Sequence, residues 1–512
     1  MSPRPRSCDV VIIGSGPGGS TLAHGLSRRG ARVLVVEEGD FLRPDPSRAD
    51  TSIHMQEFMQ GAQQSFVGGP SKFYGAALYR LREQDFQATA TETAESPAWP
   101  VRYGELEPYY DEAERLYAVR GSTHEDPSEP PRSHPFPHGP IEHEPYIAPI
   151  VERLRAQGLP VSYIPKAVDV GPGGKCILCA RCDGHYCQRD AKMDAEIAAL
   201  RPALATGRVQ LLTRTQCLRV LTTPDGRRAT GVLLQQDGET WEVDADVVAV
   251  CAGFARTPLL LRRSRNDAHP EGIGNASGCL GRYLAGHTAG LVFPMRGFKR
   301  VPDLHQKTFA INSFYGPSAE WPYPLGVIQA AGQLPLWKSV PAVARPFVRF
   351  IVERSVTCFL MTEAVASKES GFVFQGDEIV RMEPPRPNVK TFRRLRRMAI
   401  DIFKKAGFPV VLAPRSPADL WHLVGTARFG EDPATSVLDP HCRVHGMDNL
   451  YVVDSCFLPS AGAVNTTLTV IAMSLRVAEH IAARVSPHAS RPSAVSYTPL
   501  RAHETCADLV CR

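Results

Sequence analysis

A glycine-rich turn between two hydrophobic segments constrains this chain more than any other feature. Residues 8–13 (CDVVII) predict a buried parallel strand, residues 17–29 a helix, and residues 32–37 (RVLVVE) a second strand. The turn between the first strand and the helix contains four glycines: Gly14, Gly16, Gly18 and Gly19. In a dinucleotide-binding βαβ unit, such glycines allow a tight turn, a close approach of the pyrophosphate, and packing of helix on strand. The phosphates then lie at the helix N-terminus.

Glu37 completes this fingerprint at the end of the second strand, eighteen residues after Gly19. A carboxylate in this place bonds the ribose hydroxyls and disfavours the 2′-phosphate of NADP. The sequence has no second unit of this kind, because Gly272-Ile-Gly274 lacks both the preceding strand and the spacing. The fingerprint alone does not decide whether the dinucleotide is FAD or NAD. The alternative interpretation is a glycine-rich turn that binds no ligand.

The remaining chain predicts an α/β protein of two or three domains, since it has 512 residues of which 43% are apolar. Strand-like runs fill residues 209–251, a mixed segment at 290–412 contains a helix at 389–406, and a strand (449–454) and helix (466–485) follow. No apolar run is long enough to cross a membrane. The net charge of +5 is dispersed, which argues against nucleic-acid binding, and the N-terminus lacks a signal-peptide pattern. We therefore expect a cytoplasmic protein.

Two segments have two interpretations each. Residues 336–361 carry apolar residues interrupted by Arg345, Arg349 and Arg354, which favours a cationic face over a domain core, with a membrane-surface helix as the alternative. Residues 489–512 form a tail that, from about 494, looks like a translated sequencing adapter rather than a native end.

Four further segments resemble the glucose–methanol–choline (GMC) oxidoreductases: VGGPSKFYGAALYR (67–80), WPVRYGELEPYYDEAERLY (99–117), VCAGFARTPLLL (250–261) and the stretch from HLVGTARFG to NTTLTVIA (422–472). The resemblance implies a discontinuous, Rossmann-like FAD-binding domain with an inserted α+β substrate-binding domain. The implied FAD-binding parts are residues 1–118, 166–288 and 413–488. Residues 119–165 would form an excursion on the surface or into the substrate-binding domain, and residues 289–412 the substrate-binding domain itself.

The resemblance also implies which residues hold FAD. Gly14, Gly16, Gly18, Gly19 and Glu37 would bind the ADP half. The flavin would be lined by Gly68, Gly69, Ser71 and Gly75, and the adenine side flanked by Ala252 and Gly253. Asp454 would approach the pyrophosphate and ribityl region, and Asn465 and Thr466 would lie at the start of a helix pointing at the flavin pyrimidine. Its dipole would stabilise the reduced flavin by about 0.3–2 kcal/mol.

His422 and Asn465, 43 residues apart in loops, look like the catalytic pair of the family. Oxidation of an alcohol or sugar hydroxyl requires removal of a proton and a hydride, and a histidine is suited to take the proton. The resemblance implies His422 as base, Asn465 as partner of the substrate oxygen, and hydride transfer to flavin N5. His287 is expected either to line this cavity or to be structural. Thr466 replaces the usual proline, and Phe73 occupies the place of a flavin-linking histidine, so non-covalent FAD is favoured.

Four clustered cysteines remain, Cys176, Cys179, Cys182 and Cys187. Their spacing leaves open an iron–sulfur cluster, zinc, or thiols packing a loop. A cluster would favour a dehydrogenase; otherwise the electron acceptor stays open among quinone, oxygen and a redox protein. Two alternatives remain: a redox-inactive lyase on the same scaffold, and a cysteine-based redox or metal-binding flavoprotein.

Overall fold

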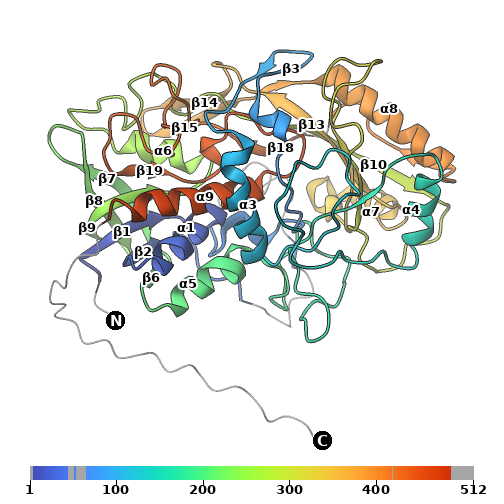
Figure 1. Ribbon diagram of the computed structural model, residues 1–512, viewed down its shortest axis with the longest axis horizontal. Coiled ribbons are helices and arrows are strands. Elements are labelled where there is room, and N and C mark those ends of the chain that lie inside the picture. The colour runs from blue at the N-terminus through green and yellow to red at the C-terminus, as the bar shows by residue number, and fades with distance from the viewer. Residues whose placement is uncertain (1–3, 44–50, 53–64, 418, 486–512) are drawn as a thin grey trace, which may run out of the picture.

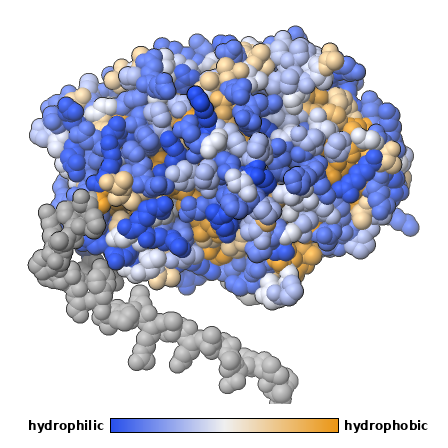
Figure 2. All heavy atoms as spheres, in the orientation of Figure 1, coloured by the Kyte–Doolittle hydropathy of each residue, from blue (hydrophilic) through white to orange (hydrophobic). Residues whose placement is uncertain are grey.

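A computed structural model describes residues 4–43, 51–52, 65–417 and 419–485. The adapter-like tail predicted from about residue 494 lies outside these residues. In the described part no helix is long and apolar enough to cross a membrane. The face shown in Figure 2 is mainly hydrophilic, with hydrophobic side chains in small separate patches.

The first sheet contains the predicted βαβ unit. Its strands are β1 (Ser7–Ile13), β2 (Val33–Val36), β6 (Val209–Leu212), β7 (Gln216–Thr222), β8 (Ala229–Gln236), β9 (Glu239–Val250) and β19 (Leu450–Val452). They are ordered β6-β2-β1-β9-β8-β7, and β19 also pairs with β9. The pairs β1–β2, β1–β9, β2–β6 and β9–β19 are parallel, whereas β7, β8 and β9 form an antiparallel meander. The β-branched runs predicted as buried strands therefore form the centre of a parallel sheet.

Three helices pack together beside this sheet. α1 (Pro17–Arg28) begins at Pro17, as proline favours the first turn, and contacts α9 (Thr467–Ala482). α3 (Tyr103–Leu116) crosses α9 on its other side (Figure 1). Because α1 and α9 come from opposite ends of the chain, the last helix completes the domain that the first residues begin.

A second set of strands, paired antiparallel throughout, forms the other half of the molecule. Its members are β5 (Ser162–Tyr163), β10 (Ala285–Met295), β11 (Phe309–Ile311), β12 (Val327–Ala330), β13 (Cys358–Val365), β16 (Arg386–Pro387), β17 (Val410–Leu412) and β18 (Asp419–Val424). The main order is β17-β10-β13-β12-β11-β5, with β16 on β13 and β18 on β10. β5 and β18 lie outside residues 289–412, so the domain limits predicted at 288, 289, 412 and 413 stay a proposal.

The other described helices and hairpins lie around the two sheets. α8 (Val389–Lys405) covers β10, where an added Cβ at Gly290 would lie 2.5 Å from the ring of Phe392. The remaining elements are α4 (Ala148–Arg155), α5 (Arg201–Ala205), α6 (Arg256–Arg263), α7 (Arg345–Val352), the hairpins β3 (Thr89–Ala90) with β4 (Glu95–Ser96) and β14 (Gly371–Gln375) with β15 (Glu378–Glu383), and short η1 (Gly69–Lys72), η2 (Glu83–Phe86), η3 (Glu196–Leu200), η4 (Leu336–Ser339), η5 (Ala342–Ala344) and η6 (Ser455–Phe457).

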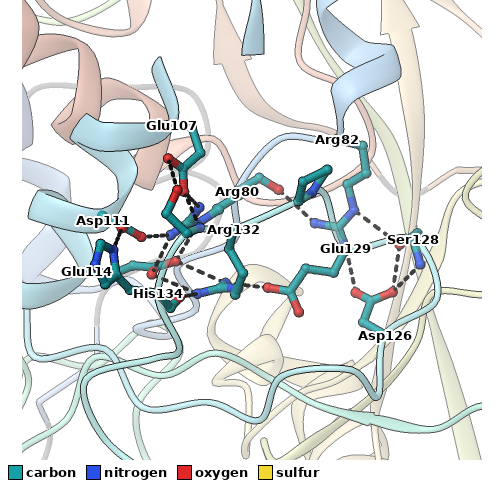
Figure 3. Close-up of polar contacts among 12 residues, drawn as sticks. Arg80, Arg82, Glu107, Asp111, Glu114, Asp126, Ser128, Glu129, Arg132 and His134 are labelled. Atoms are coloured by element: carbon teal, nitrogen blue, oxygen red, sulfur yellow. Dashed lines mark hydrogen bonds and ion pairs between the residues drawn. The ribbon is translucent and has the colours of Figure 1, made fainter. Parts of the chain in front are cut away.

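A buried charge network ties α3 to Arg80, the last residue of the glycine-rich stretch at 67–80 (Figure 3). The guanidinium of Arg80 donates to Glu114 at 2.8 Å, Asp111 at 2.5 Å and Glu107 at 3.1 Å, and its side chain is 1% exposed. Arg132 contacts the same Glu114 at 3.0 Å. Burial of one cation among several carboxylates fixes the position of this segment, since a lone buried charge would be costly.

Candidate active site

The fingerprint glycines are of two kinds. At three of them a side chain would collide with backbone atoms, and at the fourth it would project into open space. Cβ atoms added at Gly14 and Gly18 would overlap the carbonyl oxygens of Cys251 and Val453, and one at Gly19 would overlap that of Gly14. At Gly16, by contrast, an added Cβ would meet no atom within 4 Å. The backbone at Gly16 therefore faces an open space beside the N-terminus of α1, the arrangement that a pyrophosphate requires.

Glu37 points back at the turn. Its carboxylate accepts hydrogen bonds from the amide of Ser15 at 3.0 Å, the hydroxyl of Ser15 at 2.7 Å and the amide of Gly39 at 2.9 Å. The Glu37 side chain is buried at the end of β2. These bonds hold the acid at the edge of the fingerprint, where it was predicted to meet a ribose.

The second glycine-rich segment approaches the first. Gly68 donates its amide to Ser15 Oγ at 3.1 Å, and an added Cβ at Gly69 would lie 3.0 Å from Gly16 Cα. Ser71 Oγ bonds the carbonyl of Gly68 at 2.6 Å and accepts the amide of Ala195 at 3.0 Å. The structure thus brings Gly16, Gly68, Gly69 and Ser71 together.

Gly75 lies further along this segment, beside a buried ion pair. A Cβ added there would lie 2.6 Å from Lys307 Nζ, and it would overlap the carboxylate of Asp183. Lys307 and Asp183 are 2.8 Å apart, with side chains 2% and 9% exposed. No motif in the sequence points to either residue.

Asp454 joins the loop after β9 to the loop after β19. Its Oδ2 accepts the amide of Gly253 at 2.8 Å and the hydroxyl of Thr257 at 2.6 Å, while Oδ1 accepts the amide of Cys456 at 2.7 Å. The amide of Ala252 in turn donates to Thr257 at 3.1 Å. Both carboxylate oxygens of Asp454 therefore position backbone beside the fingerprint.

The predicted catalytic residues meet where β18 approaches the start of α9. His422 Nε2 lies 3.1 Å from Asn465 Nδ2, and His422 Nδ1 lies 3.0 Å from His287 Nδ1. His422 lies in β18 with a φ of 50°, rather than in the predicted loop, and an irregularity in the pairing of β18 with β10 adjoins it. His287 is fully buried in β10, whereas His422 and Asn465 are half-buried.

The hydrogen bonds determine which nitrogen of His422 carries a proton. The carbonyl of Ala461 can only accept, so His287 Nε2, 3.3 Å away, carries a hydrogen and the neutral ring has its lone pair on Nδ1. His422 Nδ1 must then donate to His287, which leaves a lone pair on His422 Nε2. At the other end, Gln329 Nε2 donates to Asn465 Oδ1 at 3.1 Å and thereby points the Asn465 amide nitrogen at His422.

The charge state of the pair agrees with this assignment. Burial lowers the pKa of His422 to about 3, and the neighbouring His287 and Lys307 lower it further. Burial likewise lowers the pKa of His287 to about 4. The lowered pKa values favour neutral rings at neutral pH, so His422 Nε2 keeps the lone pair that accepts from Asn465 Nδ2.

Comparison with known proteins identifies the family of this chain. Residues 9–289 and 386–474 match the N-terminal and C-terminal models of a family described as GMC oxidoreductase. The chain belongs to the GMC oxidoreductase family. It is 30% identical to paromamine 6′-oxidase of Streptomyces fradiae over 93% of this chain and 92% of the relative, and 26% identical to the fructose dehydrogenase large subunit of Gluconobacter japonicus over 94% and 99%.

A GMC-type arrangement also appears among solved structures. Pyridoxine 4-oxidase from Mesorbium loti superposes with a TM-score of 0.59 at 19% identity, covering 92% of this chain and 99% of the other. The predicted fold class is confirmed: a Rossmann-like domain, assembled from separated parts of the chain, adjoins a second domain.

The four clustered cysteines of this GMC chain lie in a loop between residues 176 and 187. Cys176, Cys182 and Cys187 are buried or half-buried, Cys179 is exposed, and all four are free thiols. Among the residues that the structure describes, no group of three histidine, cysteine or acidic side chains converges to hold a metal ion. The iron–sulfur and zinc interpretations are therefore unsupported.

Instead, the cysteine loop packs against the glycine-rich segment. The ammonium of Lys192 donates to the carbonyls of Lys72, Tyr74, Cys182 and His185, at 3.0, 2.9, 3.0 and 2.6 Å. This fully buried lysine clamps the two segments together.

The structure shows the surroundings of Thr466 and Phe73, the two residues that depart from the family pattern. Thr466 is the residue before α9 and accepts the amide of Val470 at 3.2 Å, so the helix begins there without proline. Phe73 is buried, with its ring 5.6 Å from that of Phe66 and 6.3 Å from that of Tyr186. A phenyl ring offers no nucleophile for a covalent link.

Proposed function

We propose that this GMC oxidoreductase binds FAD non-covalently and oxidises a hydroxyl of a small alcohol or sugar, with His422 as the base. The observation that carries the proposal is the lone pair on His422 Nε2, fixed by His287 on one side and directed at Asn465 on the other. A hydroxyl placed beside both groups can donate its proton to His422 while its oxygen accepts from the amide of Asn465.

The residues around the fingerprint fit a dinucleotide. Gly14, Gly16, Gly18 and Gly19 would hold the pyrophosphate and Glu37 the ribose. Gly68, Gly69, Ser71 and Gly75 would line the flavin, beside Ala252, Gly253, Asp454, Asn465 and Thr466. When bound, FAD supplies the acceptor for the hydride that leaves the substrate carbon.

The protein's own contribution is placement and proton transfer. Low pKa values keep His422 and His287 unprotonated before substrate arrives. The hydroxyl proton passes to His422 Nε2, while the hydrogen bond from His422 Nδ1 to His287 Nδ1 holds the ring in the orientation that accepts it. Gln329 keeps the donor end of Asn465 facing the substrate oxygen.

The test is turnover with a panel of small hydroxyl compounds. Purified holoenzyme is incubated with primary alcohols, fructose, pyridoxine and amino sugars including paromamine, with dioxygen or a redox dye as acceptor. We expect one class to yield an aldehyde or ketone with equimolar reduction of the acceptor. His422→Ala is the matched control and should yield product about a hundredfold or more slowly. Cleavage of a substrate without acceptor reduction would contradict the proposal in favour of a lyase.

A further inference from the structure

A short helix on the second domain exposes its apolar side. Of the residues of α7, only Val352 is buried. Phe347 is 68% exposed and Val343, in the preceding η5, is 90% exposed. The interpretation of residues 336–361 as a cover for a domain core is therefore wrong for this part. Val343, Phe347 and Phe350 are spaced by four and three residues and share one side of the turn, which faces outward.

A neighbouring turn extends the same apolar surface. Phe298, 82% exposed, places its ring 6.3 Å from that of Phe350. The turn is held against α7 because Arg354 donates to the carbonyl of Phe298 at 2.7 Å and Val301 donates to that of Glu353 at 2.9 Å. We call Phe298, Val343, Phe347 and Phe350, together with the basic residues of 296–303 and 336–354, the α7 surface.

The α7 surface is strongly cationic. Residues 296–303 and 336–354 together carry seven basic and two acidic residues, an excess equal to the formal net charge of +5 of the whole chain. The acid on α7's end, Glu353, is shared by Arg349 at 2.7 Å and Arg300 at 3.0 Å, whose side chains are 59% and 65% exposed. Lys299 and Arg345 are exposed as well.

We propose that the α7 surface docks on an anionic lipid bilayer. Aromatic and aliphatic side chains surrounded by arginine and lysine are the chemistry of helices that lie in a membrane interface, where basic residues meet anionic headgroups. Exposed fractions of 68–90% mean that these side chains project outward instead of lining a groove for a peptide. A second copy of the chain is disfavoured, because two surfaces of the same positive sign would repel each other.

This proposal is independent of the reaction, and lipid binding of the FAD-loaded full chain tests it. The chain is sedimented with vesicles of phosphatidylcholine alone and of phosphatidylcholine mixed with phosphatidylglycerol. We expect binding to the mixed vesicles only, weakened by salt. Phe298→Ser with Phe347→Ser, and separately Arg345→Glu with Arg349→Glu, should each lower the bound fraction about tenfold or more. The matched control, Val380→Ser with Arg381→Glu on β15, alters an exposed pair elsewhere and should bind normally.

Flavin absorbance and turnover establish that each variant is folded. Absence of binding to the anionic vesicles would overturn the proposal, as would equal loss of binding in the control. Light scattering provides the other contrary outcome: if the phenylalanine variants convert a dimer to a monomer and no variant binds lipid, the α7 surface is a contact between copies.

Discussion

At the scale of single residues, the proposed reaction depends on Nε2 of the half-buried His422 as the proton acceptor. Removing the imidazole by His422→Ala deletes the proton acceptor and leaves the fingerprint intact. We expect kcat to fall by about 10²- to 10⁴-fold, the usual contribution of a positioned base. Steady-state kinetics measure the fall, and unchanged flavin absorbance shows that the cofactor site survives. A variant with turnover near that of the parent would remove His422 from the role of base.

His287 is expected to act through His422. Its proximity lowers the pKa of His422, after the larger effect of burial. His287→Leu removes this neighbour and the partner of Nδ1, so the pKa of His422 should rise. A base with a higher pKa becomes protonated at higher pH, and the acid limb of the kcat/KM profile should move toward neutrality. A fall in kcat with an unmoved profile would indicate that His287 only fills space.

At the scale of elements, two glycines in the turn between β1 and α1 should have different roles, one in FAD binding and the other in stability. Gly16 has a φ of −66° and open space at its Cβ position, so Gly16→Ala should fold normally. Its methyl group would occupy the place of a phosphate and cost hydrogen bonds worth about 1.5–3 kcal/mol, hence about tenfold or more in FAD affinity.

Gly19→Ala is the contrasting variant, because its methyl group would meet the carbonyl of Gly14. Overpacking of this kind should cost about 1–3 kcal/mol of unfolding free energy, measured on the apoprotein. Equal FAD affinity in Gly16→Ala and the parent would contradict the assignment of this turn.

The network on α3 makes a prediction about stability alone. Arg80→Met leaves Asp111 and Glu114 buried without their main cation. We expect a loss of about 3–5 kcal/mol, as is typical when one partner of a buried pair is removed. Arg381→Met breaks an exposed pair with Glu383 and should change stability by less than about 1 kcal/mol. Chemical denaturation of both variants makes the comparison; similar small losses would show that the network is dispensable.

Elements with strong local patterns were predictable from the sequence, and convergent side chains were not. The glycine turn, α8 and α9 lie within a few residues of their predicted bounds, because periodicity and turn residues are local signals. Lys307 and Gln329 reach the candidate site only through the register of the second sheet. That sheet pairs strands more than a hundred residues apart, β5 with β11 and β18 with β10, and no local pattern encodes these pairings.

At the scale of the whole molecule, buried histidines predict acid sensitivity. Burial is the largest cause in lowering the pKa of six histidines to about 3 or 4: His24, His143, His287, His305, His422 and His480. Below the ordinary histidine pKa of about 6.5, the unfolded chain binds more protons than the folded one, so stability falls as pH falls toward 4.

Burial raises the pKa values of Asp85 and Glu363 to about 6 and 7, so these two groups make the folded chain more stable as pH falls. They are outnumbered by the six histidines. Melting temperatures of the apoprotein should therefore decrease from pH 7 to pH 5, and His24→Gln should reduce the slope. A melting temperature that is constant or rises over this range would contradict the prediction.

The most direct test of the central claim is the anaerobic visible spectrum of the holoenzyme before and after a substrate is added. We expect flavin absorbance that bleaches with a small alcohol or sugar and bleaches about a hundredfold or more slowly when His422→Ala is given the same substrate. Absence of flavin from a chain that cannot be reconstituted with FAD, or equally rapid bleaching in His422→Ala, would contradict it.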